Sequence, residues 1–195
     1  MIQIDRIELF EISLPLVEPF RISSATTTTR RILLLHLRSA EGAEVWSECV
    51  AGEVPNYSPE TVDTAWLALR EWVAPRVLGR RFAGPEELHP ALDVNLRGHN
   101  MAKAAVEMGM WGLAATLAGE PLARFAGGTR REIATGISLG IQKSPDALVA
   151  KVRAALAEGY RKAKIKIEPG HDIEWIAAAR EALGPEAHLM ADANN

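Results

Sequence analysis

Two lysines stand two residues apart in Lys164-Ile165-Lys166, and a carboxylate, Asp192, follows after one predicted helix. Side chains alternate between the faces of a strand, so the two lysines share a face if this segment is extended. A carboxylate suits a hard cation such as Mg²⁺, and a lysine near a cation and a second lysine is disfavoured in its charged form. A neutral lysine can act as a general base. Such a group of residues could remove a proton next to a carboxylate, with a cation stabilising the enediolate, an arrangement already known in enzymes.

The same residues have a structural interpretation. Alternating lysines also mark the solvent face of an edge strand, and a single Asp after a strand also serves as a turn or cap residue. Both interpretations stay open at this point. Because Asp192 and Asn194 end the following strand at the equivalent position, the two signals together favour a site.

The elements that would position these residues alternate between strand and helix after Gly128. We expect strands over residues 133–141, 162–167 and 187–193, with helices beginning at Ser144 and near Asp172. Such alternation predicts parallel strands joined by right-handed crossovers.

Each of the three strands combines an apolar face with a small or polar face. An open doubly wound sheet buries both faces, whereas a barrel directs the carboxyl ends of its inner faces to an active site. We therefore predict the first part of a (β/α) barrel, with Ser138, Lys166, Asp192 and Asn194 around one mouth.

The first half of the chain has a different pattern. Residues 2–14 alternate as a half-buried strand, Leu16–Thr29 is polar and predicts a loop, and residues 31–38 and 43–49 predict two further strands. Together they predict a three-stranded antiparallel meander.

Helices are predicted after the meander. Ser58-Pro59-Glu60 and Pro85 are helix-start signals, and a third helix is expected over Met101–Ala118 with a short one ending at Phe125. One face of the third helix is expected to carry Ala105, Met108, Trp111 and Ala115. The change of pattern predicts an α+β capping domain over residues 1–129 and a barrel portion over 130–195.

Composition excludes several classes of function. The chain has 195 residues, 48% of them hydrophobic and 24% charged, with a net charge of −3. These values are typical of a globular protein and indicate neither a nucleic-acid partner nor a membrane partner. The single cysteine, Cys49, predicts a reducing compartment and is expected to be a packed residue, so we expect a cytoplasmic protein.

Several motifs resemble one known family. Lys164 to Gly170 (Lys-Ile-Lys-Ile-Glu-Pro-Gly), with Asp172 after it, is similar to the Lys-x-Lys strand of the o-succinylbenzoate synthase and N-acylamino acid racemase group. That group belongs to the muconate-lactonizing branch of the enolase superfamily. Asp192-Ala193-Asn194 resembles its first metal-ligand motif, and residues 136–141 resemble its first barrel strand. Pro15-Leu16 and Pro19-Phe20 resemble the start of its substrate-covering loop.

The resemblance implies roles for individual residues. Lys166 would take the α-proton, Lys164 would assist it and help hold charge, and Asp192 would bind Mg²⁺, with Mn²⁺ as an alternative. The implied substrate-binding residues are Ser138 and Asn194 at the strand ends and Phe20, Arg21 and Tyr57 in two cap loops.

The chain departs from the family's pattern in two places. Trp111-Gly112 stands where the family often has Trp-Asp, and we expect a cost in local stability there. The sequence also stops after the third predicted barrel strand, whereas the resemblance implies eight strands, two further carboxylate ligands and an opposing lysine. We therefore expect an incomplete barrel, in a portion of a longer enzyme or half of a split one.

The leading functional prediction is a Mg²⁺-dependent o-succinylbenzoate synthase, a dehydratase of menaquinone biosynthesis. N-acylamino acid racemase is the main alternative, followed by dipeptide epimerase or muconate cycloisomerase. A hypothesis from another class is a non-catalytic fragment that needs the rest of the barrel. The expected partners are a small carboxylate substrate and, for the complete enzyme, further copies of itself in a homo-oligomer.

Overall fold

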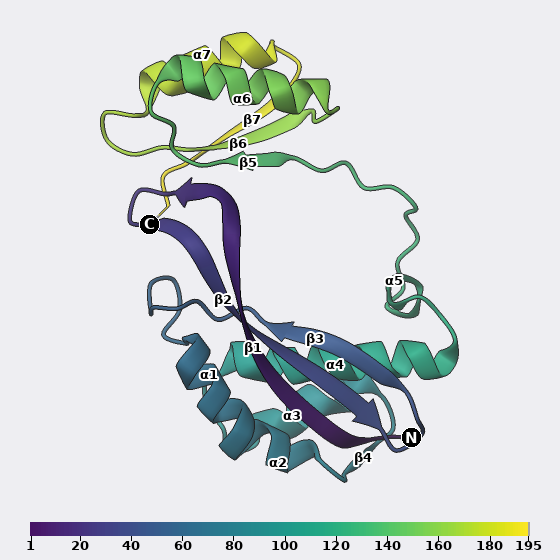
Figure 1. The fold of residues 1–195 in the computed structure, drawn as a ribbon. Helices are drawn as coiled ribbons and strands as arrows, with labels where there is room; N and C mark the ends of the chain where they lie inside the picture. Colours follow the sequence, from purple (N-terminus) through teal and green to yellow (C-terminus); the bar gives the residue numbers. More distant parts are fainter. Residues whose placement is uncertain (195) are drawn as a thin grey trace. The chain divides into compact units, whose positions relative to one another are not determined.

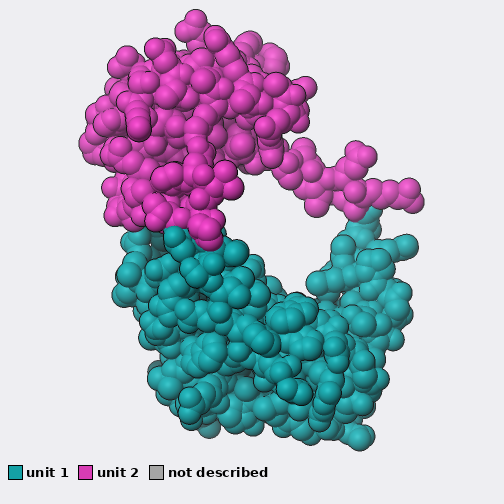
Figure 2. All heavy atoms as spheres, viewed as in Figure 1, with its two compact units in different colours: residues 1–14, 29–129 teal, residues 15–28, 130–195 magenta. Residues whose placement is uncertain are grey.

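The computed structural model describes residues 1–194, whose helices and strands are drawn in Figure 1 and form two compact units. One unit consists of residues 1–14 and 29–129, and the other consists of residues 15–28 and 130–195, as coloured in Figure 2. The predicted first domain took in all of residues 1–129, whereas the structure groups residues 15–28 with the second unit. That segment carries two of the predicted substrate-binding residues, Phe20 and Arg21.

An antiparallel sheet begins the chain, in the order β3-β2-β1-β4. Its strands are β1 (Ile2–Arg21), β2 (Thr26–Ser39), β3 (Glu44–Cys49) and β4 (Arg81–Phe82). The first three are the predicted meander, and the two-residue β4 adds a fourth strand beside β1. In the second half of β2, the alternate residues Leu33, Leu35 and Leu37 are fully buried, as expected of a strand with one face on a core.

The prediction of a loop over Leu16–Thr29 is wrong, because β1 continues to Arg21 and β2 begins at Thr26. Only residues 22–25 connect the two strands. β4 pairs with β1 at Ile2 and Gln3 alone, so the far part of β1 has an open edge at which Pro15 and Pro19 need no amide partner. The hairpin therefore extends through a sequence that looks like a loop.

The first helix after β3 begins later than predicted. α1 (Val62–Ala68) has Thr61 as its N-cap in a capping box with Thr64, not Ser58. α1 continues through a π-helical segment (Leu69–Val73) into α2 (Ala74–Val77). After β4, a 3₁₀ turn (Pro85–Glu87) leads into α3 (Leu88–Asp93), which confirms the start signal at Pro85.

Glu60 explains why the first start signal misleads. Its carboxylate accepts hydrogen bonds from the backbone amides of Met101, at 3.0 Å, and Ala102, at 3.2 Å. It therefore caps α4 (Asn100–Ala118), a helix 40 residues further along the chain, where a carboxylate meets the positive end of the dipole. A helix-start residue in the sequence thus serves a different helix from the one it precedes.

The long helix α4 packs against β3, and two of the four residues predicted to share a face, Ala105 and Ala115, are buried. Met108, predicted on the same face as Ala105 and Ala115, is 44% exposed, whereas Val106, Gly109 and Leu113 are buried. Gly109 allows the close approach, since a Cβ there would meet Leu37, whereas a Cβ at Gly112 would make only an ordinary contact with Val45. After α4, α5 (Leu122–Phe125) confirms the short predicted helix.

These two glycines should respond to alanine with opposite signs. A Cβ at Gly109 would lie 2.6 Å from both Leu37 Cδ atoms, so we expect Gly109→Ala to destabilise the protein by about 1–3 kcal/mol through overpacking. A Cβ at Gly112 would lie 3.4 Å from Val45 Cγ1, an ordinary contact. Gly112→Ala should therefore stabilise the protein by about 0.5–1 kcal/mol through helix propensity. Urea unfolding of both variants measures this, and equal effects would contradict the described packing.

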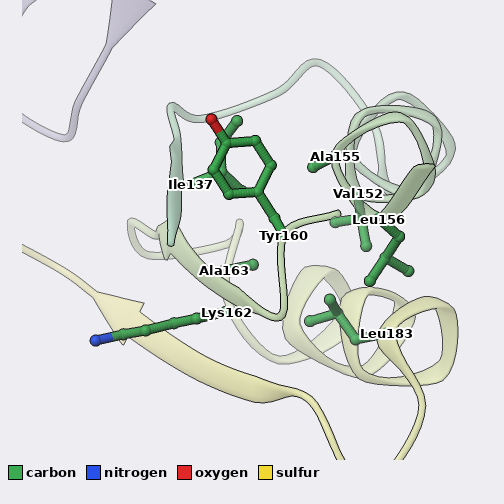
Figure 3. A pocket seen from close by; sticks show the side chains of 8 residues that line it. All are labelled: Ile137, Val152, Ala155, Leu156, Tyr160, Lys162, Ala163 and Leu183. Carbon is green, nitrogen blue, oxygen red and sulfur yellow. The ribbon is translucent and has the colours of Figure 1, made fainter. Parts of the chain in front are cut away.

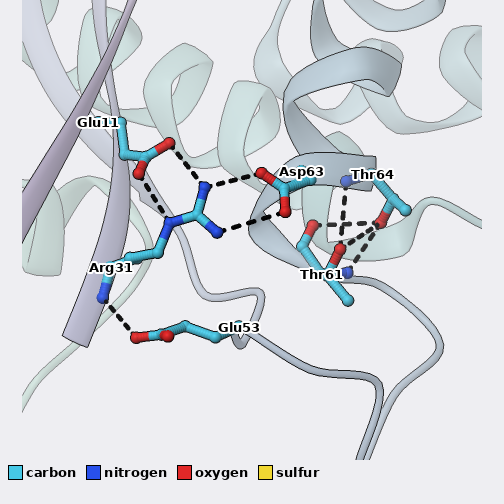
Figure 4. Close-up of polar contacts among 6 residues, drawn as sticks. All are labelled: Glu11, Arg31, Glu53, Thr61, Asp63 and Thr64. Carbon is cyan, nitrogen blue, oxygen red and sulfur yellow. Dashed lines mark hydrogen bonds and ion pairs between the residues drawn. The ribbon is translucent and has the colours of Figure 1, made fainter. Parts of the chain in front are cut away.

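An ion-pair network joins β1, β2 and α1 in the first unit (Figure 4). Arg31 Nε lies 2.7 Å from Glu11 Oε1, and its Nη2 lies 2.7 Å from Asp63 Oδ1. The backbone amide of Arg31 also donates to Glu53 Oε1. The hydrogen bonds from Arg31 hold the pKa values of the Glu11 and Asp63 carboxyls below their usual range.

This network predicts a dependence of stability on pH. A lowered carboxyl pKa in the folded state stabilises the protein above the unfolded-state pKa of about 4, and this contribution is lost as pH falls through the lower folded value. We expect Arg31→Met to lower stability at pH 7 and to make it less sensitive to pH between about 5 and 2. Thermal unfolding of both proteins across that range checks this, and parallel pH profiles would contradict it.

The second unit contains a parallel sheet of three strands in the order β5-β6-β7, which confirms the predicted alternation of strands and helices. The two helices of this unit have Ser144 and Asp172 as their N-caps, as predicted. The first strand is shorter than predicted. The elements are β5 (Ile137–Leu139), α6 (Pro145–Ala157), β6 (Lys162–Lys166), α7 (Ile173–Leu183) and β7 (His188–Asp192).

A separate apolar core holds this unit together, with Leu148, Val152 and Ile165 buried between the helices and the sheet. The crevice in Figure 3 lies against this core, and its lining includes neither Lys166 nor Asp192. Lys162, at the start of β6, extends its ammonium group away from the crevice (Figure 3). The crevice is therefore distinct from the predicted site. Among residues 1–194, no helix combines the length and apolarity needed to cross a bilayer.

Candidate active site

Three charged side chains meet at the carboxyl ends of β6 and β7. Lys166 Nζ donates a hydrogen bond of 2.7 Å to Asp192 Oδ2, and Lys164 Nζ lies 3.0 Å from the same oxygen. The Lys166 side chain is 9% exposed, whereas that of Lys164 is 37% exposed. The structure thus brings together the two lysines and the carboxylate that the sequence singled out, and the more buried lysine is the predicted acid/base.

The register of the parallel sheet produces this cluster. Lys166 pairs directly with Asp192 across β6 and β7, and Lys164 pairs with Ser138 on β5 and with Met190 on β7. Alternation along β6 buries Ala163 and Ile165 on the core side and leaves the lysines on the other. The lysines therefore do not occupy the solvent face of an edge strand, because β6 is the central strand of the three.

Asp192 is held from both sides. Its Oδ1 accepts a hydrogen bond of 2.9 Å from the backbone amide of Asn194, a residue with a positive φ of 61°. The lysine contacts and this amide hold the pKa of the Asp192 carboxyl well below its usual range, with the Lys166 hydrogen bond as the largest cause. Asp192 is therefore ionised at neutral pH and fixed in orientation.

The predicted substrate-binding residues fall into two groups. Ser138 is exposed beside Lys164, and Asn194 lies two residues after Asp192, so both lie at the mouth of the strands. Phe20 and Arg21 also belong to the second unit, at the tip of the β1–β2 hairpin. Tyr57 lies in the first unit, in the connection between β3 and α1, and is 60% exposed.

Sequence reasoning assigned no role to Glu168, which contacts the hairpin tip. Glu168 Oε1 lies 2.7 Å from Arg21 Nη2, and its side chain is 15% exposed. His171 Nδ1 lies 3.4 Å from the same oxygen, and the His171 ring packs on Trp175. A signal was present, since Glu168 continues the two-residue alternation of Lys164 and Lys166.

The residues at the strand ends fit a divalent cation in part. Asp192 supplies one hard, ionised oxygen ligand of the kind that Mg²⁺ prefers. Within residues 1–194, no three His, Cys, Asp or Glu side chains lie together as a metal-binding group. Asp192 is the only carboxylate in the cluster that the structure describes, and its two oxygens already accept from Lys166 and from the Asn194 amide. The described residues could therefore provide one ligand and not a complete site.

Cys49 has no place in this cluster. It ends β3 in the first unit and is 2% exposed, and burial raises the pKa of its thiol. A buried thiol of raised pKa is a packed residue and not a nucleophile, as the sequence predicted.

Comparison with known families gives two matches. Residues 6–127 match the family described as "Mandelate racemase / muconate lactonizing enzyme, N-terminal domain". Residues 147–195 match the family described as "Enolase C-terminal domain-like". The two matches follow the two patterns of secondary structure along the chain.

Known proteins resemble the chain over nearly its whole length. An o-succinylbenzoate synthase of Geobacillus kaustophilus is 40% identical over 194 residues, which are 100% of this chain and 51% of the relative. An N-succinylamino acid racemase of Thermus thermophilus is 45% identical over 193 residues, 99% of this chain and 52% of the relative. The chain thus spans about half the length of the curated relatives it matches.

A solved structure shows the same fold. The substrate-liganded L-Ala-D/L-Glu epimerase of Bacillus subtilis superimposes with a TM-score of 0.89 at 30% identity, covering 98% of this chain and 54% of the epimerase.

Proposed function

Because the chain belongs to the mandelate racemase / muconate lactonizing enzyme family, we propose that the whole protein removes a proton from the carbon next to a substrate carboxylate. The observation that carries the proposal is the cluster at the strand ends, where Lys166 and Lys164 contact the ionised Asp192. It combines an amine suited to proton transfer with an anionic ligand suited to Mg²⁺.

The reaction we propose first is the dehydration that forms o-succinylbenzoate, in the biosynthesis of menaquinone. Lys166 takes the α-proton and returns a proton to the departing hydroxyl, so that a C–H and a C–O bond break, a C=C bond forms and water leaves. Lys164, which lies on the same face, adds positive charge beside the carboxylate of the substrate. Mg²⁺ bound with Asp192 as one ligand would stabilise the negative charge that develops on that carboxylate.

Racemisation of N-acylamino acids is the second candidate, and the 45% identity to the Thermus thermophilus racemase favours it. It shares the first half of the reaction, removal of the α-proton by Lys166. It differs in that a proton returns to the opposite face of the same carbon, which requires a second acid. Dipeptide epimerisation would use the same steps on a different substrate, and the fold of the Bacillus subtilis epimerase makes it a third candidate.

Direct assays of the whole protein separate these reactions. We would incubate it with the hydroxy-cyclohexadiene carboxylate that loses water to give o-succinylbenzoate, with an N-succinyl-L-amino acid and with L-Ala-L-Glu. Each substrate would be tested with Mg²⁺ and with EDTA. The proposal expects Mg²⁺-dependent formation of the aromatic product, and racemisation alone would favour the second candidate. No turnover of any of the three would contradict the proposed chemistry and support the non-catalytic hypothesis. A homo-oligomer and a cytoplasmic location stay predictions from the sequence.

A further inference from the structure

The tip of the β1–β2 hairpin is anchored to the ends of all three parallel strands. The backbone amide of Ile141, just after β5, donates a 2.9 Å hydrogen bond to the carbonyl oxygen of Arg21. Ser23 Oγ donates a 3.0 Å hydrogen bond to the carbonyl oxygen of Ala193, just after β7. Arg21 binds Glu168, just after β6. The tip thus has one contact per strand at the end of the sheet where Lys166 and Asp192 lie.

Glu168 is the anchor closest in sequence to the proposed acid/base. It follows Lys166 by two residues, and the turn after it is closed by a 2.8 Å hydrogen bond from the His171 amide to the Glu168 carbonyl oxygen. Gly170, with a φ of 82°, occupies the left-handed position of this turn. His171 contacts the same carboxylate oxygen as Arg21 and packs on Trp175 at a ring separation of 4.6 Å. The turn therefore fixes the backbone at Glu168, and its carboxylate lies between Arg21 and His171.

The backbone of the hairpin tip packs directly against Gly140. A Cβ at this position would lie 2.8 Å from the carbonyl oxygen of Arg21, 3.2 Å from its amide nitrogen and 3.4 Å from Phe20 Cδ2. Two of these neighbours are backbone atoms, which cannot rotate away as a side chain can. The backbone of the tip thus approaches β5 more closely than any residue other than glycine would allow.

We infer that Glu168 and Arg21 form a positioning pair that holds the hairpin tip, with Phe20, against the strand ends beside Lys166. This inference rests on the proposed function for its effect on substrate, although the docking of the tip itself does not. An ion pair of this exposure is weak alone, so the pair acts together with the contacts at Ile141 and Ser23. When the pair is lost, the tip is undocked in a fraction of the molecules. Because only molecules with a docked tip bind substrate well, the apparent affinity for substrate falls in proportion.

The test uses Glu168→Gln, Arg21→Gln and the double variant in the whole protein, with Glu174→Gln as control. Glu174 is an exposed carboxylate in the first turn of α7. Hydrogen exchange at the Ile141 amide reports docking, because that amide donates to Arg21. We expect roughly two- to fivefold faster exchange in each single variant, no further increase in the double variant, and no change in Glu174→Gln. Unchanged exchange at Ile141 in both single variants would overturn the inference.

Kinetics provide the second readout. We expect KM to rise roughly two- to fivefold in Glu168→Gln with kcat nearly unchanged, and Arg21→Lys to recover part of the loss that Arg21→Gln causes. Gly140→Ala should raise both the exchange rate and KM further, because its Cβ displaces the tip directly. Equal losses in kcat with unchanged KM would contradict a positioning role. Faster exchange at Ile141 in a protein without activity on any assayed substrate would support the pair and contradict the proposed function.

Discussion

Replacing Lys166 with methionine is expected to lower kcat by about 10²- to 10⁴-fold, the contribution typical of a positioned general acid or base. The Lys166 side chain is only 9% exposed, so its aliphatic stem is packed. Methionine keeps most of that stem and removes the amine that contacts Asp192. The loss should therefore appear in the chemical step and not in folding. Steady-state kinetics of the whole protein, with circular dichroism as a folding check, measure this.

Lys162→Met is the matched control. Lys162 begins the same strand, β6, and its side chain is exposed at the end opposite to Asp192. We expect its kcat and KM to stay within about twofold of those of the parent protein, as for surface substitutions away from special features. If both lysine variants lost activity equally, the specific role of Lys166 would be wrong.

Asp192→Asn is expected to weaken the response to Mg²⁺ by at least about 10²-fold, since even changes next to a metal ligand cost 10- to 100-fold in affinity. Asparagine keeps an oxygen that can accept from the Asn194 amide, but it lacks the charge that both lysines contact. The Mg²⁺ concentration giving half-maximal activity measures the effect.

The control for this change is Asp146→Asn, an exposed carboxylate in the first turn of α6. It removes the same charge at a place that contacts neither lysine. An Asp192→Asn protein with the Mg²⁺ response of the parent would show that Asp192 is not a ligand. In that case its role would be limited to orienting Lys164 and Lys166.

Local patterns were sufficient to predict the cluster. The alternation of side chains along β6 and the position of Asp192 at the carboxyl end of β7 can each be read from a few neighbouring residues. Parallel pairing of the two strands then brings Lys166 and Asp192 into register. The N-caps Ser144 and Asp172 were predictable for the same reason, since each side chain bonds to an amide within its own first turn.

Long-range contacts account for what the sequence did not predict. Ser58-Pro59-Glu60 has the composition of a helix start, yet Glu60 binds the amides of α4, and only the tertiary fold reveals this. The polar hairpin tip has the composition of a loop, yet Arg21 binds Glu168 at a separation of 147 residues. Gly109 in α4 was a local signal of close helix–sheet approach, which a prediction based on the spacing of large apolar residues did not take into account.

Exchange of the α-proton with solvent tests the central claim most directly. The whole protein would be incubated in D₂O with Mg²⁺ and N-succinyl-L-phenylalanine, a substrate analogue whose α-hydrogen is visible by proton NMR. We predict that the α-proton is replaced by deuterium with the parent protein and with Lys162→Met, and that Lys166→Met exchanges at least about 10²-fold more slowly. Exchange at the parental rate in Lys166→Met would contradict the assignment of Lys166 as the residue that takes the proton.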